Sequence, residues 1–181
     1  MTVFPLASRP GAQDGTTTRG NREPGEPKTG AYLQPGRIFV GRGEEAVKTV
    51  LGSCVAVCLW DAERAIGGMN HYLLPLRARG SRSSARFGEV AIQQLLEELE
   101  RRGARRNGLR ARVYGGACVV DSLRRSGGGV GPRNIEVAER LLDHLGIPIV
   151  ARDVGGRAGR RVVFRVGDGE VWMRHLQRGR R

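Results

Sequence analysis

The sequence predicts a layered α+β domain with two main helices and about seven or more strands. Two stretches repeat apolar residues at helical spacing, one over residues 88 to 102 and one that begins near Asn134. The other apolar runs are short and are bounded by glycine, proline or charged residues, as strands are. Several of these runs follow one another directly, which favours packed layers over a regular βαβ array.

Three strands are expected in the first half of the chain. The stretch RIFVG from about Arg37 is the first. The stretch TVLGSCVAVCLWD, residues 49 to 61, is apolar on both faces and is therefore predicted as one central strand. A turn over AERAIGG leads into GGMNHYLLP, a short strand that ends at Pro75 because proline cannot donate to a sheet ladder.

The two helices carry apolar stripes and glycine stops. The first is predicted over about 88 to 102 and ends at Gly103; the second begins at Asn134 or the preceding residues and ends at Gly146. Their stripes consist of Ala91, Ile92, Leu95, Leu96 and Leu99, and of Ile135, Ala138, Leu141, Leu142 and Leu145. Between the helices, residues 109 to 120 read as a strand interrupted by a glycine pair. After them, GDG between two apolar stretches predicts a hairpin.

Composition divides the chain into one domain and two tails. Residues 1–33 are rich in Thr, Gly, Pro, Arg and Glu without an apolar period, so we expect a disordered tail. The folded domain is expected over 34–176, with a mobile Arg-rich loop near 77–86 and a basic tail at 177–181. At 181 residues the chain is long enough for one domain with a core.

Charge and cysteine content narrow the class of protein. The net charge is +13, but lysine occurs only at Lys28 and Lys48 and aromatic residues make up 5%, so stacking platforms for bases are scarce. We therefore expect no nucleic-acid binding, and a positive surface that faces solvent or an acidic partner. The sequence has no apolar run of membrane-spanning length, no secretory signal pattern and an odd number of cysteines, which together favour a reduced, cytoplasmic protein without membrane insertion.

The candidate chemistry centres on Cys54 and His71. A catalytic thiol needs a base, and His71 lies on the adjacent predicted strand, within reach if the strands pair. Thr49, upstream on the same predicted strand as Cys54, can orient the imidazole as the third member of a triad. The Gly52-Ser53 step allows a tight turn whose N–H groups can stabilise an oxyanion.

A core role for Cys54 is the competing interpretation, since cysteine in an apolar run is usually buried packing; Cys58 and Cys118 are expected to be core residues. A metal site from Cys54, Cys58, His71 and a fourth ligand lacks the usual ligand spacing, so no metal is expected. No cofactor is expected either. SGGGVGPRN lacks the P-loop and dinucleotide spacings and reads as a loop, while DVGGRAGRR fits either an anion nest or a turn.

Several motifs together resemble the CheD family of chemoreceptor glutamine deamidases. They are TVLGSCVAVCLWD, GGMNHYLLP, FGEVAIQQLL, YGGA, VGPRN and DVGGRAGRRVVF, in that order, and the resemblance spans about residues 35 to 176. The departures are Cys118 after YGGA, where the family commonly continues towards Met-Phe, and VGPRN in place of IGxRN.

The resemblance implies a cytoplasmic amidohydrolase with an α/β/β sandwich fold that converts glutamines of methyl-accepting chemotaxis receptors to glutamates. The family's catalytic cysteine, histidine and threonine fall on Cys54, His71 and Thr49. Some members also bind and stimulate a CheC-type phosphatase, so a non-enzymatic adaptor role is the alternative function. Some members are also described as hydrolysing receptor methyl esters.

Overall fold

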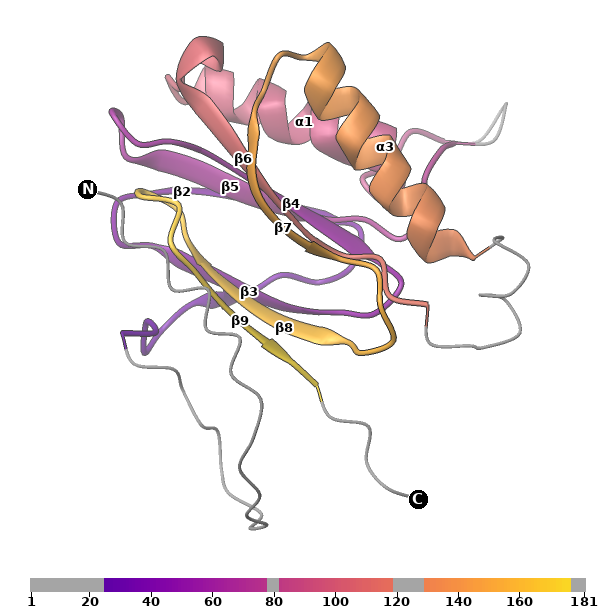
Figure 1. The fold of residues 1–181 in the computed structure, drawn as a ribbon. Helices are drawn as coiled ribbons and strands as arrows, with labels where there is room; N and C mark the ends of the chain where they lie inside the picture. The colour runs from indigo at the N-terminus through magenta and orange to yellow at the C-terminus, as the bar shows by residue number, and fades with distance from the viewer. Residues whose placement is uncertain (1–24, 78–81, 119–128, 177–181) are drawn as a thin grey trace, which may run out of the picture.

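The computed structural model describes residues 25–77, 82–118 and 129–176, and it folds them into two sheets and two α-helices (Figure 1). The strands are β1 (Ala31–Tyr32), β2 (Arg37–Arg42), β3 (Ala46–Leu51), β4 (Val55–Asp61), β5 (Ile66–His71), β6 (Leu109–Gly115), β7 (Ile149–Val154), β8 (Arg160–Arg165) and β9 (Val171–His175). The helices are α1 (Gly88–Arg101) and α3 (Val130–His144), with a short 3₁₀ turn at Arg106–Gly108.

The sheets stack to give three layers. One sheet has the strand order β2-β5-β4-β6-β7, and the other has the order β1-β3-β8-β9. Figure 1 shows α1 and α3 together on one face of the five-stranded sheet, with the four-stranded sheet on its other face. This α/β/β arrangement confirms the predicted fold class.

Two apolar cores hold the layers together, and β4 contributes to both. All seven residues of β4 are buried. Val55, Val57 and Leu59 pack under the helices, whereas Ala56 and Cys58 face the four-stranded sheet. Because successive side chains of a strand point to opposite faces, a continuous apolar run is what a strand between two layers requires. The predicted central position of this strand is confirmed.

Both helices follow the predicted apolar stripes. All five stripe residues of α1 are buried, and α3 buries Ala138 and Leu142. The second helix begins at Val130, so VGPRN belongs to its first turn and not to a loop. Pro132 is accommodated there because the first-turn N–H groups have no intrahelical partner.

The prediction of one strand over 49–61 is wrong. β3 ends at Leu51 and belongs to the four-stranded sheet, whereas β4 starts at Val55 and belongs to the five-stranded sheet. Residues 52 to 54 therefore form the corner at which the chain changes sheets. Apolar side chains continue through the corner because both strands bury residues against the same core, and the sequence pattern does not record the change of direction.

The predicted tail over 1–33 extends too far at its C-terminal end. Ala31 and Tyr32 form β1 beside β3, Leu33 is buried, and Glu26 is buried in an ion pair with Arg161. These contacts cover the outer face and one edge of the four-stranded sheet. Residues 1–24 and the basic tail at 177–181 lie outside the described residues, as do positions 78–81 of the Arg-rich loop.

The GDG turn and the glycine pair lie where the sequence predicts them, whereas the strand predicted up to Pro75 ends at His71. The GDG turn joins β8 to β9 in an antiparallel hairpin, and β6 ends at the predicted glycine pair. The last residues of the strand expected over 109–120 lie outside the described part of the chain. Within the described ranges, no helix has the length and apolarity needed to cross a membrane.

Gly115, at the end of β6, passes the corner residue Cys54 at very close range. Its φ is +110°, and a Cβ at this position would collide with the Cys54 carbonyl oxygen. The N–H of the next residue, Gly116, donates to that same oxygen at 2.7 Å. The corner is thus held by backbone contacts that only glycine at position 115 permits.

Gly115→Ala is expected to destabilise the protein more than Gly103→Ala. Gly103 has a φ of +99° and open space around it, so both variants carry left-handed strain but only Gly115→Ala adds a collision with backbone. Urea denaturation should give a free energy of unfolding for Gly115→Ala that is about 1–3 kcal/mol lower than that for Gly103→Ala. Equal losses in the two variants would show that the contact with Cys54 is not tight.

Candidate active site

The corner at Gly52–Cys54 places Cys54 next to the last residues of β5. Val55 and Tyr72 exchange two backbone hydrogen bonds, of 3.1 and 3.0 Å, immediately beside the corner. Cys54 is half-buried and packs against the core between the sheets, whereas Ser53 is exposed. The thiol therefore sits where a buried strand meets the surface.

Strand register brings Cys54 and His71 to the same face of the five-stranded sheet. Ala56 and Cys58 of β4 face the core between the sheets, and so does Met69 of β5. Because side chains alternate along a strand, Cys54 two residues before Ala56 and His71 two residues after Met69 share that face. They are diagonal neighbours across the strand pair, at a separation that long side chains can bridge.

Thr49 reaches His71 from the opposite sheet. It lies on β3 between Val47 and Leu51, which both belong to the core between the sheets, and it is 1% exposed. The prediction that Thr49 lies on the strand that carries Cys54 is therefore wrong, since Thr49 approaches His71 across the sandwich from β3.

The hydrogen bonds of Thr49 define the tautomer of His71. The Thr49 hydroxyl donates to the carbonyl oxygen of Leu33 at 2.9 Å, and Thr49 Oγ1 lies 2.8 Å from His71 Nδ1. A hydroxyl has a single hydrogen, and a carbonyl oxygen can only accept. His71 must therefore donate its Nδ1–H to Thr49 Oγ1, which leaves Nε2 of the neutral ring with a free lone pair.

His71 Nε2 is the base that this arrangement provides. It is buried and has no hydrogen-bond partner among the residues that the structure describes, so Cys54 Sγ is not bonded to it in this conformation. A buried nitrogen without a hydrogen-bond partner destabilises the folded protein unless it binds a proton or a ligand. The structure joins Thr49 to His71 by a hydrogen bond, and it places Cys54 on the same face without one.

Burial keeps both titrating groups neutral. It raises the pKa of the Cys54 thiol, an effect that the backbone N–H of the same residue opposes. Burial also lowers the pKa of His71, and the Leu33 carbonyl opposes this shift. A neutral thiol and a neutral imidazole are thus the resting state, and the thiolate forms when Nε2 accepts the thiol proton.

The carbonyl groups and the N–H groups of the corner differ in their hydrogen bonding. Its carbonyl groups are occupied: Gly52 accepts from Ala117, Ser53 from the Asn134 side chain, and Cys54 from Gly116. Within the described residues, the N–H groups of Ser53 and Cys54 donate to no other residue. N–H groups held in this way can stabilise negative charge that develops on a bound carbonyl oxygen.

Asn134 holds the corner, a role that the sequence does not reveal. Its side-chain N–H groups donate to the carbonyl oxygens of Ser53 and Leu73, each at 3.0 Å, and its backbone carbonyl accepts from the Tyr72 hydroxyl. It is fully buried at the start of α3. One amide therefore ties the strand end that follows His71 to the residue that precedes Cys54. The only sequence signal is its position in VGPRN.

The DVGG segment supports the glycine pair from behind. Gly155 donates to Gly115, and Cys118 donates to Gly156. The Arg160 side chain, 2% exposed, donates to Asp153 at 2.6 Å and to the Gly155 carbonyl at 2.8 Å. Since this arginine is occupied within the turn, its contacts favour the turn interpretation of this segment over the anion nest.

The other cysteines and histidines lie outside this arrangement. Cys58 is a core residue, as predicted, and burial raises the pKa of its thiol strongly. Cys118 is half-buried, not core. His144 ends α3, and His175 contacts Asp153 at 3.2 Å. Among the described residues, no three His, Cys, Asp or Glu side chains are grouped so that they could hold a metal ion.

Comparison with known proteins points to one family. The sequence model of the family described as "CheD chemotactic sensory transduction" matches residues 73–175. This range begins two residues after His71 and therefore leaves out Thr49, Cys54 and His71.

Full-length relatives cover more of the chain. "Probable chemoreceptor glutamine deamidase CheD 1" of Anaeromyxobacter dehalogenans is 50% identical over 145 residues, which are 80% of this chain and 84% of that protein. Proteins named "Probable chemoreceptor glutamine deamidase CheD" from Sulfurimonas denitrificans and Trichlorobacter lovleyi are 39% and 40% identical, over 81% and 83% of this chain and 94% and 93% of theirs. Among solved structures, the hypothetical protein YfiH of Bacillus licheniformis aligns with 66% of this chain and 49% of its own, at 17% identity and a TM-score of 0.41.

The lowered pKa of His71 predicts a loss of stability in weak acid. Below about pH 6.5 the unfolded chain binds a proton at this histidine before the folded protein does, so the free energy of unfolding falls as the pH drops towards the folded-state pKa. Urea denaturation between pH 7.5 and pH 5 should show this fall in the wild type, and a smaller one in His71→Asn. Identical slopes in the two proteins would mean that His71 is not held neutral by the fold.

Proposed function

The chain belongs to the CheD family, and from this premise we propose that it is a cytoplasmic protein-glutamine deamidase. Its substrates are glutamine side chains of methyl-accepting chemotaxis receptors, which it converts to glutamates with release of ammonia. The chain spans most of the length of relatives whose names describe chemoreceptor glutamine deamidases. The catalytic unit is the domain that we expect over 34–176.

One observation carries the assignment of roles. His71 donates Nδ1–H to the buried Thr49 hydroxyl, its Nε2 has no partner among the described residues, and His71 shares a sheet face with the half-buried Cys54. This is the order of groups that an activated nucleophile requires: a thiol, a base and a residue that orients the base. We assign Cys54 as the nucleophile, His71 as the general base and acid, and Thr49 as the residue that orients His71.

The reaction starts from the neutral pair. As Cys54 Sγ bonds to the side-chain carbonyl carbon of the substrate glutamine, His71 Nε2 accepts the thiol proton. The carbonyl oxygen becomes an oxyanion, which the N–H groups of Ser53 and Cys54 stabilise; Gly52 supplies the turn that presents them. The imidazolium keeps the hydrogen bond from its Nδ1–H to Thr49, so the charged ring stays in place at the site.

Collapse of this intermediate releases ammonia. An amide nitrogen is a poor leaving group as an anion, so His71 Nε2–H protonates it while the carbon–nitrogen bond breaks and a thioester to Cys54 remains. Water then attacks the thioester carbon, and His71 accepts its proton. The thiol leaves with that proton, and the substrate side chain is now a glutamate carboxyl group.

The second expected role, binding of a CheC-type phosphatase, stays a prediction. It requires a surface rather than the thiol, so it is compatible with catalysis by the same chain. Hydrolysis of receptor methyl esters also stays a prediction. The same acyl transfer chemistry can serve an ester, since an alcohol is an easier leaving group than an amide nitrogen.

Incubation of a receptor cytoplasmic fragment from the same organism tests the proposal. The wild type should convert specific glutamines to glutamates, as located by mass spectrometry of peptides. Cys54→Ala should remain folded and lose at least about 10⁴-fold in rate, because removal of a nucleophile leaves only binding and oxyanion stabilisation.

Cys118→Ala is the matched control and should keep its activity, since Cys118 lies outside the proposed triad. Conversion at the wild-type rate by folded Cys54→Ala would contradict the proposal. An unfolded Cys54→Ala protein would support the core interpretation instead.

A further inference from the structure

A surface groove lies beside the candidate active site. It has a volume of about 490 Å³ and is lined by Pro35, Gly36, Arg37, Leu73, Ser84 and Arg86. Three segments that are distant in sequence meet there: the start of β2, the chain that follows β5, and the segment before α1. No step of the proposed reaction uses this groove.

Register ties this groove to the nucleophile. Arg37 is the direct cross-strand partner of His71, and Leu73 stands opposite Cys54, one step beyond the Val55–Tyr72 pair. Directly opposed residues share a face, with Cβ atoms about 5 Å apart. The groove is therefore on the catalytic side of the sheet, two strands from Cys54, or on the order of 10 Å.

The two arginines of the groove have no carboxylate partner in the part of the chain that the structure describes. Many other arginines do: ion pairs within the chain hold Arg64, Arg101, Arg102, Arg106, Arg140, Arg152, Arg160, Arg161 and Arg165. Ion pairs thus occupy part of the positive charge that the sequence suggests as a general acidic-partner surface. Arg37 and Arg86 are among the arginines without an ion pair in the described part of the chain, and they line one groove.

The frame of the groove is well defined. The Arg86 carbonyl accepts from the N–H groups of both Leu73 and Leu74, at 2.9 and 3.0 Å, which fixes the Arg86 backbone to the end of β5. The Arg86 side chain lies over Gly36, where a Cβ would come within 2.8 Å of its Cγ. The Gly36 N–H donates to the His71 carbonyl, so the groove and the catalytic histidine share one backbone frame.

We propose that Arg37 and Arg86 form a carboxylate-binding subsite that recognises an Asp or Glu side chain of the substrate near the target glutamine. This inference rests on the proposed function. Guanidinium groups bind carboxylates through charge-assisted hydrogen bonds, and two of them converging on one groove select for negative charge. If the substrate is α-helical, a separation on the order of 10 Å corresponds to one to two helical turns between the carboxylate and the glutamine.

The subsite would select among the glutamines of a receptor. A glutamine with a suitably spaced carboxylate gains binding energy that other glutamines lack, which raises kcat/KM for that position. Both arginines are solvent-exposed, so the preference should weaken as ionic strength rises.

A binding measurement on the inactive enzyme tests the subsite. The background is Cys54→Ala, and the probes are two labelled receptor-derived peptides with one glutamine each; one carries a Glu one to two turns away, and the other has Ala there. Fluorescence anisotropy should show roughly 10-fold tighter binding of the Glu peptide. Arg37→Ala combined with Arg86→Ala should abolish that difference.

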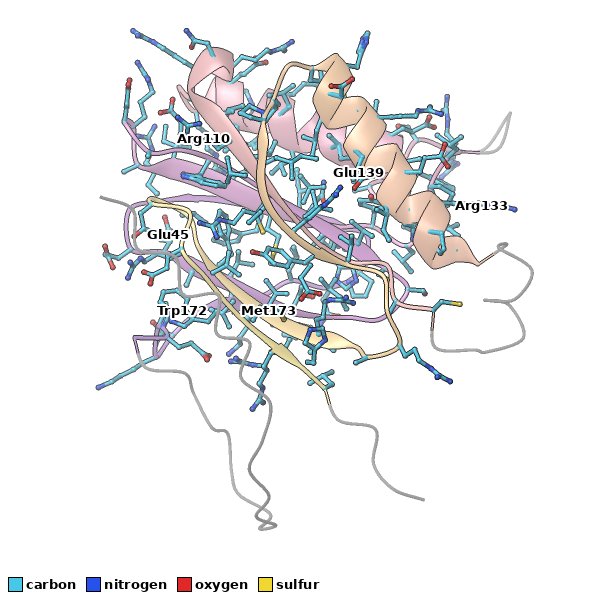
Figure 2. The ribbon with its side chains drawn as sticks, viewed as in Figure 1. Glu45, Arg110, Arg133, Glu139, Trp172 and Met173 are labelled. Carbon is cyan, nitrogen blue, oxygen red and sulfur yellow. The ribbon has the colours of Figure 1, made fainter. Side chains whose placement is uncertain are left out.

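Arg110→Ala is the matched control. Arg110 is an exposed arginine of β6 (Figure 2), at the end of that strand opposite to Gly115, and it has no ion pair among the described residues. This variant should keep the preference for the Glu peptide. Equal binding of both peptides by the enzyme with intact arginines, or an equal loss of preference in Arg110→Ala, would overturn the subsite.

Deamidation of the same two peptides by the enzymes that keep Cys54 distinguishes a failure of the subsite from a failure of the proposed function. If the unsubstituted enzyme deamidates both peptides at equal kcat/KM, the subsite is wrong and the proposed function stands. If it deamidates neither but the binding difference is present, the proposed function fails and the carboxylate site stands.

Discussion

The hydrogen bond between Thr49 and His71 is the contact on which the arrangement of the site depends, because it crosses from one sheet to the other. A histidine at the end of β5 can by itself carry its proton on either ring nitrogen. Thr49 fixes the proton on Nδ1 because its own hydrogen is committed to the Leu33 carbonyl. The stacking of the two sheets is therefore a requirement of the proposed chemistry as well as of stability. Burial between the sheets also keeps the ring neutral, since desolvation disfavours the imidazolium until Nε2 accepts the thiol proton.

The thiol is placed by a different set of contacts, all of them at the corner between the sheets. The carbonyl groups of Gly52, Ser53 and Cys54 are each bound by a donor from elsewhere in the chain. These donors come from the segment after β6 and from the start of α3, and the DVGG turn supports the first of them. These three hydrogen bonds fix the backbone of the corner and leave the N–H groups of Ser53 and Cys54 available to a substrate. Rigid placement matters because a misplacement on the order of 1 Å is enough to slow such a reaction substantially.

Local patterns in the sequence predict most of the layers, but not how the layers meet. Periodicity identifies both helices, and glycine identifies the β8–β9 turn, because these features depend on neighbouring residues. The stretch 49–61 is misread because apolar side chains continue through the corner, so that Thr49 is assigned to the same strand as Cys54. Asn134 is missed since its partner Ser53 lies 81 residues away, and no local pattern encodes such a contact. The order of Thr49, Cys54 and His71 is nevertheless visible in the sequence, and so is the strand pairing that brings the last two together.

The most direct test of this account is the tautomer of His71, measured by nitrogen-15 NMR of histidine-labelled protein near pH 7.5. The three histidines can be assigned by substituting His144 and His175, which lie outside the site. The account predicts a neutral His71 ring with the proton on Nδ1 and a bare Nε2, and loss of this fixed tautomer in Thr49→Val. A ring protonated on Nε2, or an imidazolium at this pH, would contradict it, because neither form can accept the proton of the Cys54 thiol.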